Sequence, residues 1–297
     1  MNVGYVGLGN MGGALARRLQ LAHPLRVYDL DQHAVARMVE AGATACASLG
    51  EVARACDIIF LCLPKSEHVR AAVFDPDGLA GALRPGALLV DQTTGDPKVT
   101  RQLAHLLAAR GVALIDAPVS GGAAGAKAGT ISIMLGAGEA ERARIAPLLT
   151  AISPNVFHAG DVGAGQVMKL VNNMISGAQR LLSMEGLALA AKSGVDPSRA
   201  LEILVAGGAR NAYLDKQAPS ILRGQLEVGF TLGLMAKDMR LACEFGADSG
   251  VPQFFASVAH EVYKLCISQI GADAQVTAAA QVIDRLAGSH VVGSIHR

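Results

Sequence analysis

Short apolar runs alternate with amphipathic stretches through the first 116 residues of the chain. The runs are bounded by Gly, Pro, Asp or Asn, which is typical of strands, and Asp57–Leu63 reads as a parallel strand covered on both faces. The stretches between them repeat apolar positions every three or four residues and predict helices. The predicted strands are 3–6, 25–28, 44–46, 57–63, 87–91 and 112–116, and the predicted helices are 11–21, 32–39 and 97–109.

This alternation predicts an α/β fold with a doubly wound parallel sheet, which binds ligands at the carboxyl ends of its strands. Two further strands, 131–136 and 155–158, extend the sheet around a helix over 139–150. The alternation stops at Gly165, and the later stretches predict only helices. They are 166–192, 198–206, 212–223, 231–249, 252–267 and 275–287. We therefore expect a sheet domain at 1–162 and an all-α domain at 163–297, joined through the long helix.

Composition narrows the classes of partner. Hydrophobic residues make up 51% and charged residues 17% of the 297 residues, so the chain can bury a sizeable core and is not disordered. The net charge is +1 and Lys and Arg form no long run, which argues against nucleic acid or an anionic membrane as the main partner. The longest apolar run is far shorter than the ~18 residues of a membrane-spanning helix. Five cysteines without a Cys-x-x-Cys pair indicate reduced thiols in a cytoplasmic protein, and neither a signal peptide nor a metal site is expected.

The most informative stretch follows the first predicted strand. Gly7, Gly9 and Gly12 have the spacing Gly-x-Gly-x-x-Gly between a strand and a helix. In a dinucleotide-binding Rossmann fold, these glycines permit a tight turn, close approach of a pyrophosphate and close packing of the helix, whose N-terminus attracts the phosphates. Asp29 ends the second strand about 20 positions later, where such folds place the acid that binds a ribose hydroxyl. The residues expected to contact the dinucleotide are Asp29 and the turn residues Gly7, Leu8, Gly9, Asn10, Met11 and Gly12.

Three other strand ends carry candidate ligand contacts. The dipeptide Leu63-Pro64 by itself only ends a strand, and Thr93-Thr94 fits a turn or a helix cap as well as it fits a cofactor contact. The tripeptide Ser120-Gly121-Gly122 combines a hydroxyl with two residues that leave the backbone N–H groups accessible. Such a segment suits an anion-binding nest, and a flexible turn is the alternative.

Polar residues interrupt the apolar surface of the long predicted helix near its start. Lys169 lies among Val, Met and Leu residues and shares a helix face with Asn173, four positions later. Because lysine is rarely buried without a partner, this pair indicates a site, whereas a lysine that snorkels at the helix edge is the alternative. Lys237 and Asp238 form a second polar pair, which by itself also fits a surface position.

Taken in order, these residues resemble those of the β-hydroxyacid dehydrogenase family, which includes 3-hydroxyisobutyrate dehydrogenase and tartronate semialdehyde reductase. The resemblance spans essentially the whole chain and rests on motifs that follow one another at compatible spacing. The motifs are Gly-Leu-Gly-x-Met-Gly at 7–12, Leu-Pro at 63–64, Asp-x-Thr-Thr-x-x-Pro at 91–97, Asp-Ala-Pro-Val-Ser-Gly-Gly at 116–122, Gly-x-x-x-Lys-x-x-Asn-Asn at 165–173 and Phe-x-x-x-Leu-x-x-Lys-Asp at 230–238.

The resemblance implies that Lys169 is the general acid/base. It also implies that Ser120, Gly121 and Gly122 hold the substrate carboxylate and that Asn173 orients the substrate. The expected activity is hydride transfer between a nicotinamide and a small 3-hydroxy acid, similar to 3-hydroxyisobutyrate, or its semialdehyde. A lysine that acts as a base must be neutral, and desolvation together with the nearby nicotinamide cation lowers the pKa of such an amine. Family members form dimers or tetramers through their helices, so a homodimer or homotetramer is expected.

For the cofactor, the resemblance implies that Leu63-Pro64 and Thr94 line the nicotinamide end and that Lys237 reaches the cofactor from the helical domain. Asp29 favours NAD, because its carboxylate accepts a hydrogen bond from a ribose 2′-hydroxyl but repels a 2′-phosphate. Family members that use NADP commonly have Asn-Arg-Ser/Thr at this point. This chain has Asp-Leu-Asp at 29–31.

The sequence leaves several alternative functions open. An NADP-linked glyoxylate or succinic semialdehyde reductase is disfavoured by Asp29, and a non-catalytic nucleotide-binding scaffold would not need Lys169, Asn173 and Ser120 together. A decarboxylating relative of 6-phosphogluconate dehydrogenase fits least, because the chain lacks a larger helical domain and a basic cluster. Arg210 could pair with a second anionic group of the substrate. A solvated arginine is slightly favoured at that position.

Overall fold

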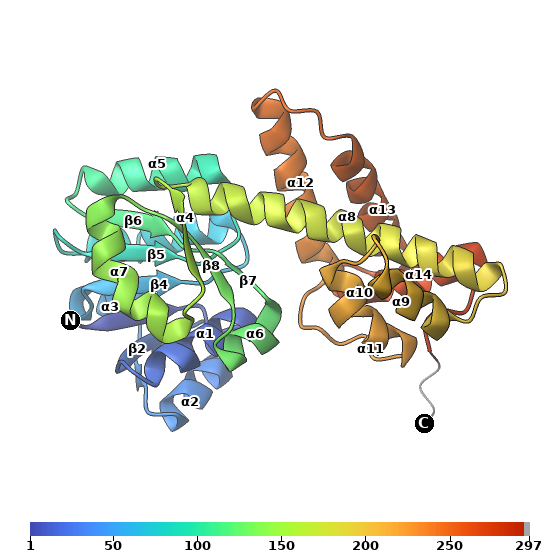
Figure 1. The fold of residues 1–297 in the computed structure, drawn as a ribbon. Helices are drawn as coiled ribbons and strands as arrows, with labels where there is room; N and C mark the ends of the chain where they lie inside the picture. Colours follow the sequence, from blue (N-terminus) through green and yellow to red (C-terminus); the bar gives the residue numbers. More distant parts are fainter. Residues whose placement is uncertain (294–297) are drawn as a thin grey trace. The chain divides into compact units, whose positions relative to one another are not determined.

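A computed structural model describes residues 1–293, which form two compact units (Figure 1). Unit 1 comprises Met1–Lys169, and unit 2 begins at Leu170. The division falls inside the long helix α8 (Ala164–Lys192), whereas the apolar pattern places the domain boundary between residues 162 and 163, just before this helix begins.

Unit 1 is built on a nine-stranded sheet with the strand order β3-β2-β1-β4-β5-β6-β8-β7, and β9 pairs with β8. Strands β1 to β6 pair in parallel, as predicted, whereas β8 runs antiparallel to both β6 and β7. The strands are β1 (Val3–Val6), β2 (Leu25–Tyr28), β3 (Thr44–Ala45), β4 (Ile58–Leu61), β5 (Leu88–Asp91), β6 (Ala113–Asp116), β7 (Val119–Ser120), β8 (Ser132–Gly136) and β9 (Val156–Gly160).

Helices cover both faces of this sheet (Figure 1). Side chains of β4 alternate between two cores: Ile58 and Phe60 pack with α1, α2 and α7, while Ile59 and Leu61 pack with α3, α4 and α5. Burial on both faces is the physical reason for the uninterrupted apolar run in this strand. The helices of unit 1 are α1 (Asn10–Gln20), α2 (Gln32–Glu40), α3 (Leu49–Ala55), α4 (Ser66–Phe74), α5 (Pro97–Ala108), α6 (Gly122–Ala128) and α7 (Glu139–Ile152), with a 3₁₀ turn η1 (Leu79–Gly81).

Unit 2 is helical, as predicted, and packs around an apolar core of its own. The single helix predicted over 212–223 is wrong, because two short helices meet there at Gln217. Pro219 lies in the first turn of the second helix, where a backbone N–H group has no intrahelical partner. Inside a continuous helix, the proline would remove a hydrogen bond. Besides the rest of α8, the unit contains α9 (Pro197–Ala206), α10 (Ala212–Lys216), α11 (Ala218–Leu222), α12 (Leu232–Asp248), α13 (Phe254–Ile270), a 3₁₀ turn η2 (Val276–Ala278) and α14 (Ala279–Ala287).

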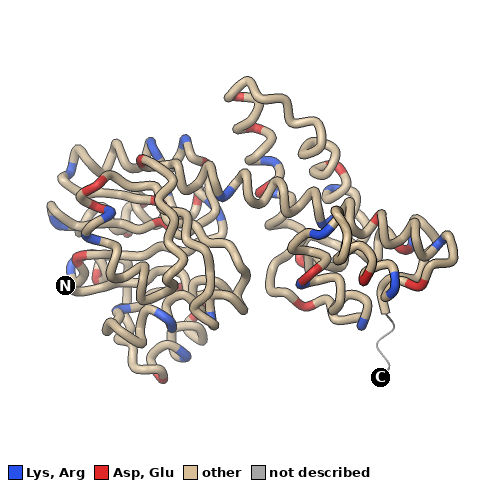
Figure 2. Tube along the Cα trace, viewed as in Figure 1, with Lys and Arg blue, Asp and Glu red and all other residues tan. Residues whose placement is uncertain are grey.

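Charged residues of both signs are interspersed along the traces of the two units (Figure 2). This distribution agrees with the formal net charge of +1. A surface with mixed charges favours a small-molecule partner over a polyanion, which would require a continuous basic stripe.

Candidate active site

Parallel pairing brings the predicted ligand contacts of unit 1 to one edge of the sheet. Val6 at the end of β1 lies opposite Tyr28 and Leu61, the last residues of β2 and β4. Leu61 lies opposite Asp91, which lies opposite Asp116. The segments that follow these ends therefore lie side by side, at the edge where α/β sheets bind ligands. They are Gly7–Gly12, Asp29, Leu63-Pro64, Thr93-Thr94 and Ala117.

The turn after β1 requires glycine at two positions. Gly7 has a φ of +92°, which L side chains rarely adopt, and a Cβ atom there would collide with the carbonyl oxygen of Cys62. A Cβ atom at Gly12 would collide with the carbonyl oxygen of Gly7. At Gly9, by contrast, a Cβ atom would meet nothing within 4 Å, so its backbone faces open space.

The residues of this turn fit a dinucleotide. Helix α1 begins at Asn10, and neither a capping side chain nor an acidic residue occupies its first turn. Its N-terminal N–H groups therefore suit a pyrophosphate placed against the open backbone of Gly9. The carboxylate of Asp29 accepts hydrogen bonds from the N–H groups of Leu8, at 2.5 Å, and Asp31, at 2.8 Å. A carboxylate has about four acceptor sites, so capacity is left for a ribose hydroxyl.

The loops after β4 and β5 are joined by a side chain. The hydroxyl of Thr93 accepts a hydrogen bond from the Leu63 N–H group at 3.0 Å, and the Thr93 N–H group donates to Asp91 at 2.9 Å. Thr93 therefore has a structural role in the turn. Thr94, the threonine predicted to contact the cofactor, is half-buried, and Pro64 is exposed.

Ser120 lies in β7, beyond the carboxyl end of β6. Strand β7 continues the chain past the end of β6, and Ser120 pairs with Ser132 of β8. The next two residues, Gly121 and Gly122, have φ values of +136° and +71°, a combination accessible only to glycine. Helix α6 follows directly, so the segment joins a strand to a helix.

Two buried side chains for which the sequence predicted no role, Asp116 and Gln166, hold the start of α8 against the sheet. The Asp116 carboxylate accepts hydrogen bonds from the N–H groups of Gly163, at 2.6 Å, and Gln166, at 2.7 Å. The Gln166 amide accepts one from the Gly95 N–H group at 2.9 Å and donates to the Thr93 carbonyl oxygen at 2.7 Å. These bonds connect the loop after β5 to the helix turn that precedes Lys169, so they fix the backbone position from which the Lys169 side chain extends. The helical period could have indicated Gln166, which lies three residues before Lys169 on the same face.

Gln166→Leu is expected to reduce the free energy of unfolding by about 2–5 kcal/mol, because the Gly95 N–H group and the Thr93 carbonyl oxygen would be buried without partners. Gln102→Leu on the exposed face of α5 is the matched control and should change it by less than about 0.5 kcal/mol. Urea unfolding followed by circular dichroism measures both. Equal stability of the two variants would contradict a structural role for the Gln166 amide.

Stability should also depend on pH through Asp116. Burial raises the pKa of this carboxyl from 3.8 to about 6, although its two N–H donors oppose the shift. Between these values the folded protein holds a proton that the unfolded chain has released, so the free energy of unfolding falls as pH rises, by about 3 kcal/mol in total. Wild type should therefore lose stability relative to Asp116→Asn between about pH 4 and pH 6, and the difference should be constant above about pH 7. Melting temperatures of both proteins across this range test it; a pH-independent difference would contradict the assignment.

A polar group inside unit 2 joins α8 to α12. The Asn173 amide donates a hydrogen bond to one oxygen of Asp238 at 2.6 Å, and the Lys237 ammonium pairs with the other at 3.0 Å. The side chains of Lys237 and Asp238 are 9% and 2% exposed, so the surface interpretation of this pair is wrong. Asp238 belongs to the candidate site, and sequence reasoning identified it only as a neighbour of Lys237.

The predicted site residues thus fall into two groups. The glycine turn, Asp29, the strand-end residues, the Ser120 segment and Lys169 belong to unit 1, whereas Asn173 and Lys237 meet at Asp238 in unit 2. Lys169 is only 8% exposed, which does not fit an amine that snorkels into solvent. Arg210 is exposed and pairs with Asp215 at 3.1 Å, in agreement with the solvated arginine favoured above.

A dinucleotide cradle on a parallel sheet, followed by a buried lysine on a long helix, defines a two-domain nicotinamide-dependent dehydrogenase. Sequence profiles support this class. The NAD-binding domain of 6-phosphogluconate dehydrogenase matches residues 2–160, and the profile described as NAD-binding of NADP-dependent 3-hydroxyisobutyrate dehydrogenase matches 163–283. The chain belongs to the β-hydroxyacid dehydrogenase family and is an NAD(P)-dependent hydroxyacid dehydrogenase.

Individual relatives support the same family. The chain is 37% identical to 2-(hydroxymethyl)glutarate dehydrogenase of Eubacterium barkeri, over 89% of this chain and 88% of the relative. It is 35% identical to NAD-dependent L-serine dehydrogenase of Pseudomonas aeruginosa, over 96% and 99%. Among solved structures, 3-hydroxyisobutyrate dehydrogenase of Mycobacterium tuberculosis with L-serine superimposes with a TM-score of 0.85 at 28% identity, covering 95% of this chain and 98% of that one.

Proposed function

We propose that the protein is an NAD-dependent dehydrogenase of a small 3-hydroxy acid, similar to 3-hydroxyisobutyrate, or a reductase of the matching semialdehyde. The observation that carries the proposal is the buried Lys169, which follows directly on the anchored first turn of α8 in the unit that carries the dinucleotide cradle. A buried amine in the unit that carries a dinucleotide cradle is a candidate for the proton transfer that oxidation of a hydroxyl requires. A scaffold that only binds a nucleotide would not need it.

In the proposed mechanism, Lys169 moves the proton. Its amine takes the hydroxyl proton of the substrate during oxidation and returns it to the carbonyl oxygen during reduction. The Ser120 hydroxyl and the N–H groups of Gly121 and Gly122 hold the substrate carboxylate. Both glycines have positive φ values, a conformation that side chains would prevent and that suits an anion-binding nest. Asn173, whose amide orientation is set by Asp238, orients the substrate. NAD, when bound, supplies the chemistry of hydride acceptance and donation.

The proposed cofactor contacts follow the resemblance and the geometry of unit 1. Gly7–Gly12 would hold the pyrophosphate, and Asp29 would bind the adenosine ribose. Leu63-Pro64 and Thr94 would line the nicotinamide end, at the strand ends adjoining the glycine turn. For Lys237 we propose a cofactor contact as well, with the Asp238 carboxylate holding its ammonium group in place.

An absorbance assay at the NADH wavelength tests the activity. The panel is 3-hydroxyisobutyrate, L-serine, glycerate, 4-hydroxybutyrate and 2-(hydroxymethyl)glutarate, with NAD or NADP. We expect turnover of at least one 3-hydroxy acid with NAD. Binding of NAD without turnover of any member would favour the non-catalytic scaffold instead, and turnover of 4-hydroxybutyrate with NADP would favour the succinic semialdehyde reductase.

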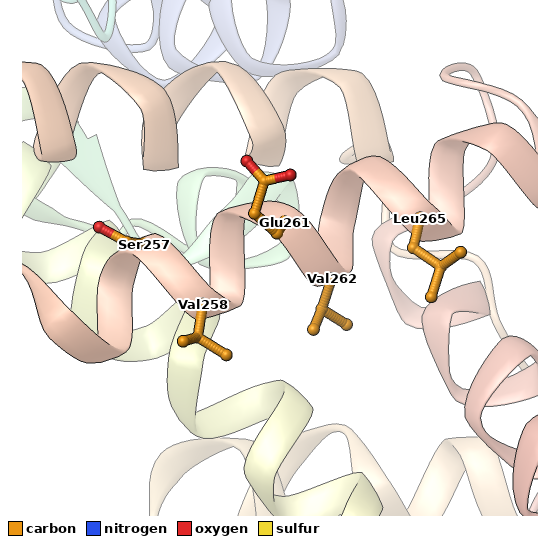
Figure 3. Close-up of a pocket in the computed structure, with 5 residues that line it drawn as sticks. All are labelled: Ser257, Val258, Glu261, Val262 and Leu265. Carbon is orange, nitrogen blue, oxygen red and sulfur yellow. The ribbon is translucent and has the colours of Figure 1, made fainter.

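Exposed apolar side chains on unit 2 suit association between copies of the chain. On α13, Phe254, Phe255 and Val258 are 75%, 84% and 65% exposed, and Val258, Val262 and Leu265 point to the same side of the helix around a shallow hollow (Figure 3). Water contact with exposed apolar side chains is unfavourable, which is why faces that carry several of them commonly form interfaces. We propose a homodimer or homotetramer that uses this face, and light scattering of wild type and Phe255→Glu tests it: an unchanged mass would contradict it.

The compartment proposed for the enzyme is the cytoplasm. All five cysteines are free thiols, which a reducing compartment maintains. Within residues 1–293, no helix combines the length and apolar character needed to cross a bilayer. Cell fractionation with markers for each compartment tests the assignment, and recovery of the protein outside the cytoplasmic fraction would contradict it.

A further inference from the structure

Arg180 is a buried cation on α8 within unit 2. It is 7% exposed, and its Nε and Nη2 atoms donate to the side-chain oxygen of Gln217 at 3.2 and 3.1 Å. The Nη1 atom is buried without a hydrogen-bond partner. No carboxylate of residues 1–293 forms an ion pair with this guanidinium.

Two tyrosine side chains also lie close to Arg180. The guanidinium carbon lies 5.7 Å from the ring centroid of Tyr213, a residue that is 5% exposed. The Tyr213 hydroxyl is also buried without a hydrogen-bond partner. Burial raises the pKa of this phenol, so it keeps its proton and can donate. The Tyr263 phenol interacts with Arg180 as well, and its own proton is donated to the carbonyl oxygen of Gly177 at 2.9 Å.

Such a cluster is electrostatically incomplete. An arginine cannot lose its proton in a protein, and buried charges are normally paired because removing a charge from water is costly. Neutral amide and phenol oxygens compensate only part of that cost. The Arg180 Nη1 atom and the Tyr213 hydroxyl are therefore two donors without partners in one buried cluster. A carboxylate can accept hydrogen bonds from both, and arginine is the side chain best suited to bind a carboxylate.

Helix geometry connects this cluster to the candidate active site. Arg180 follows Asn173 by two helical turns, about 10 Å along the axis, so both lie on one face of α8. Side chains on a helix lean toward its N-terminus, which directs Arg180 toward Asn173. Asn173 is the residue that the proposed function assigns to substrate orientation.

We propose that Arg180 and Tyr213 form a binding site for one carboxylate group, with the Arg180 guanidinium as its charged partner and the Tyr213 hydroxyl as a second donor. The carboxylate comes either from the far end of a dicarboxylic hydroxy acid or from a free small carboxylate. The first source rests on the proposed function, because it makes this cluster the distal part of the substrate site. The second does not require it.

Binding experiments test the site itself, whether or not the enzyme turns over. Acetate and glutarate are titrated into the NADH-bound protein in chloride-free buffer, with calorimetry as the readout. We expect Arg180→Met to raise the Kd at least about tenfold and Tyr213→Phe to raise it by about threefold or more, because a hydrogen bond to a charged group contributes more than a neutral one. Arg210→Met removes the same charge from an exposed position of unit 2 and should bind as wild type does.

Kinetics then identify the source of the carboxylate. If the substrate supplies it, Arg180→Met lowers kcat/KM for 2-(hydroxymethyl)glutarate at least about tenfold more than for 3-hydroxyisobutyrate. If a free carboxylate supplies it, both substrates change alike while acetate binding is lost. Circular dichroism checks that Arg180→Met folds. If Arg180→Met does not fold, the carboxylate Kd of Tyr213→Phe, which lacks only one oxygen atom, tests the proposal. The proposal is overturned if neither acetate nor glutarate binds wild type more tightly than the folded variants. Absence of turnover in wild type would instead contradict the proposed function.

Discussion

Replacing Lys169 with alanine should lower kcat by about two to four orders of magnitude, the usual contribution of a positioned general acid/base. The variant should still bind NADH, because the glycine turn and Asp29 do not depend on this side chain. Lys169→Arg should be almost as inactive, since a guanidinium keeps its charge but cannot accept the hydroxyl proton. Initial rates of NADH formation over a range of pH, together with NADH binding by fluorescence, provide the measurement.

The matched control is Lys127→Ala, which removes an exposed lysine from α6 in the same unit and should leave kcat unchanged. A Lys169→Ala enzyme with the kcat and the pH profile of wild type would remove Lys169 from the acid/base role. Loss of NADH binding together with activity would point to a role in folding or cofactor binding instead of proton transfer.

The second large effect concerns the cofactor: kcat/KM with NAD should exceed that with NADP by at least about tenfold. The Asp29 carboxylate would lie close to the 2′-phosphate of NADP and repel it, whereas the 2′-hydroxyl of NAD donates to it. Asp29→Asn keeps an oxygen that can accept from the Leu8 N–H group, which wild-type Asp29 binds at 2.5 Å, but removes the charge. The preference for NAD should therefore shrink at least about tenfold in this variant, mainly through an improved kcat/KM with NADP.

Asp31→Asn is the comparison for this experiment, because it removes a charge from the same loop while its own role is to cap α2. The NAD preference of Asp31→Asn should stay closer to that of wild type than the preference of Asp29→Asn does. Equal use of NAD and NADP by the wild-type enzyme would show that the carboxylate at position 29 does not select the cofactor.

Much of unit 1 could be predicted from the sequence because its constraints are local or periodic. Burial on both faces produces the unbroken apolar runs of the strands, and the backbone at Gly7 and Gly12 excludes every side chain. The short helices α3, α4 and α6 were not predicted, because seven to nine residues contain few repeats of an apolar face. The equally short α2 was predicted, since Asp31 marks its start and Gly42 follows its end. In unit 2, the division of the segment 212–223 followed from Pro219, a local signal that the apolar period obscures.

Sequence by itself therefore determined the fold class, the dinucleotide turn, the acid at position 29 and the unusual lysine at 169, since each is specified by neighbouring residues or by one helical period. Only the tertiary structure decided which polar side chains support them. Asp116 reaches Gly163 and Gln166, and Asp238 reaches Asn173. Arg180 lies against Tyr213 and forms no ion pair with a carboxylate of residues 1–293. All of these partners are far apart in the chain. The physical reason is that a hydrogen bond or an unpaired charge depends on position in space, and strand register and helix packing set that position through contacts distributed over a whole unit.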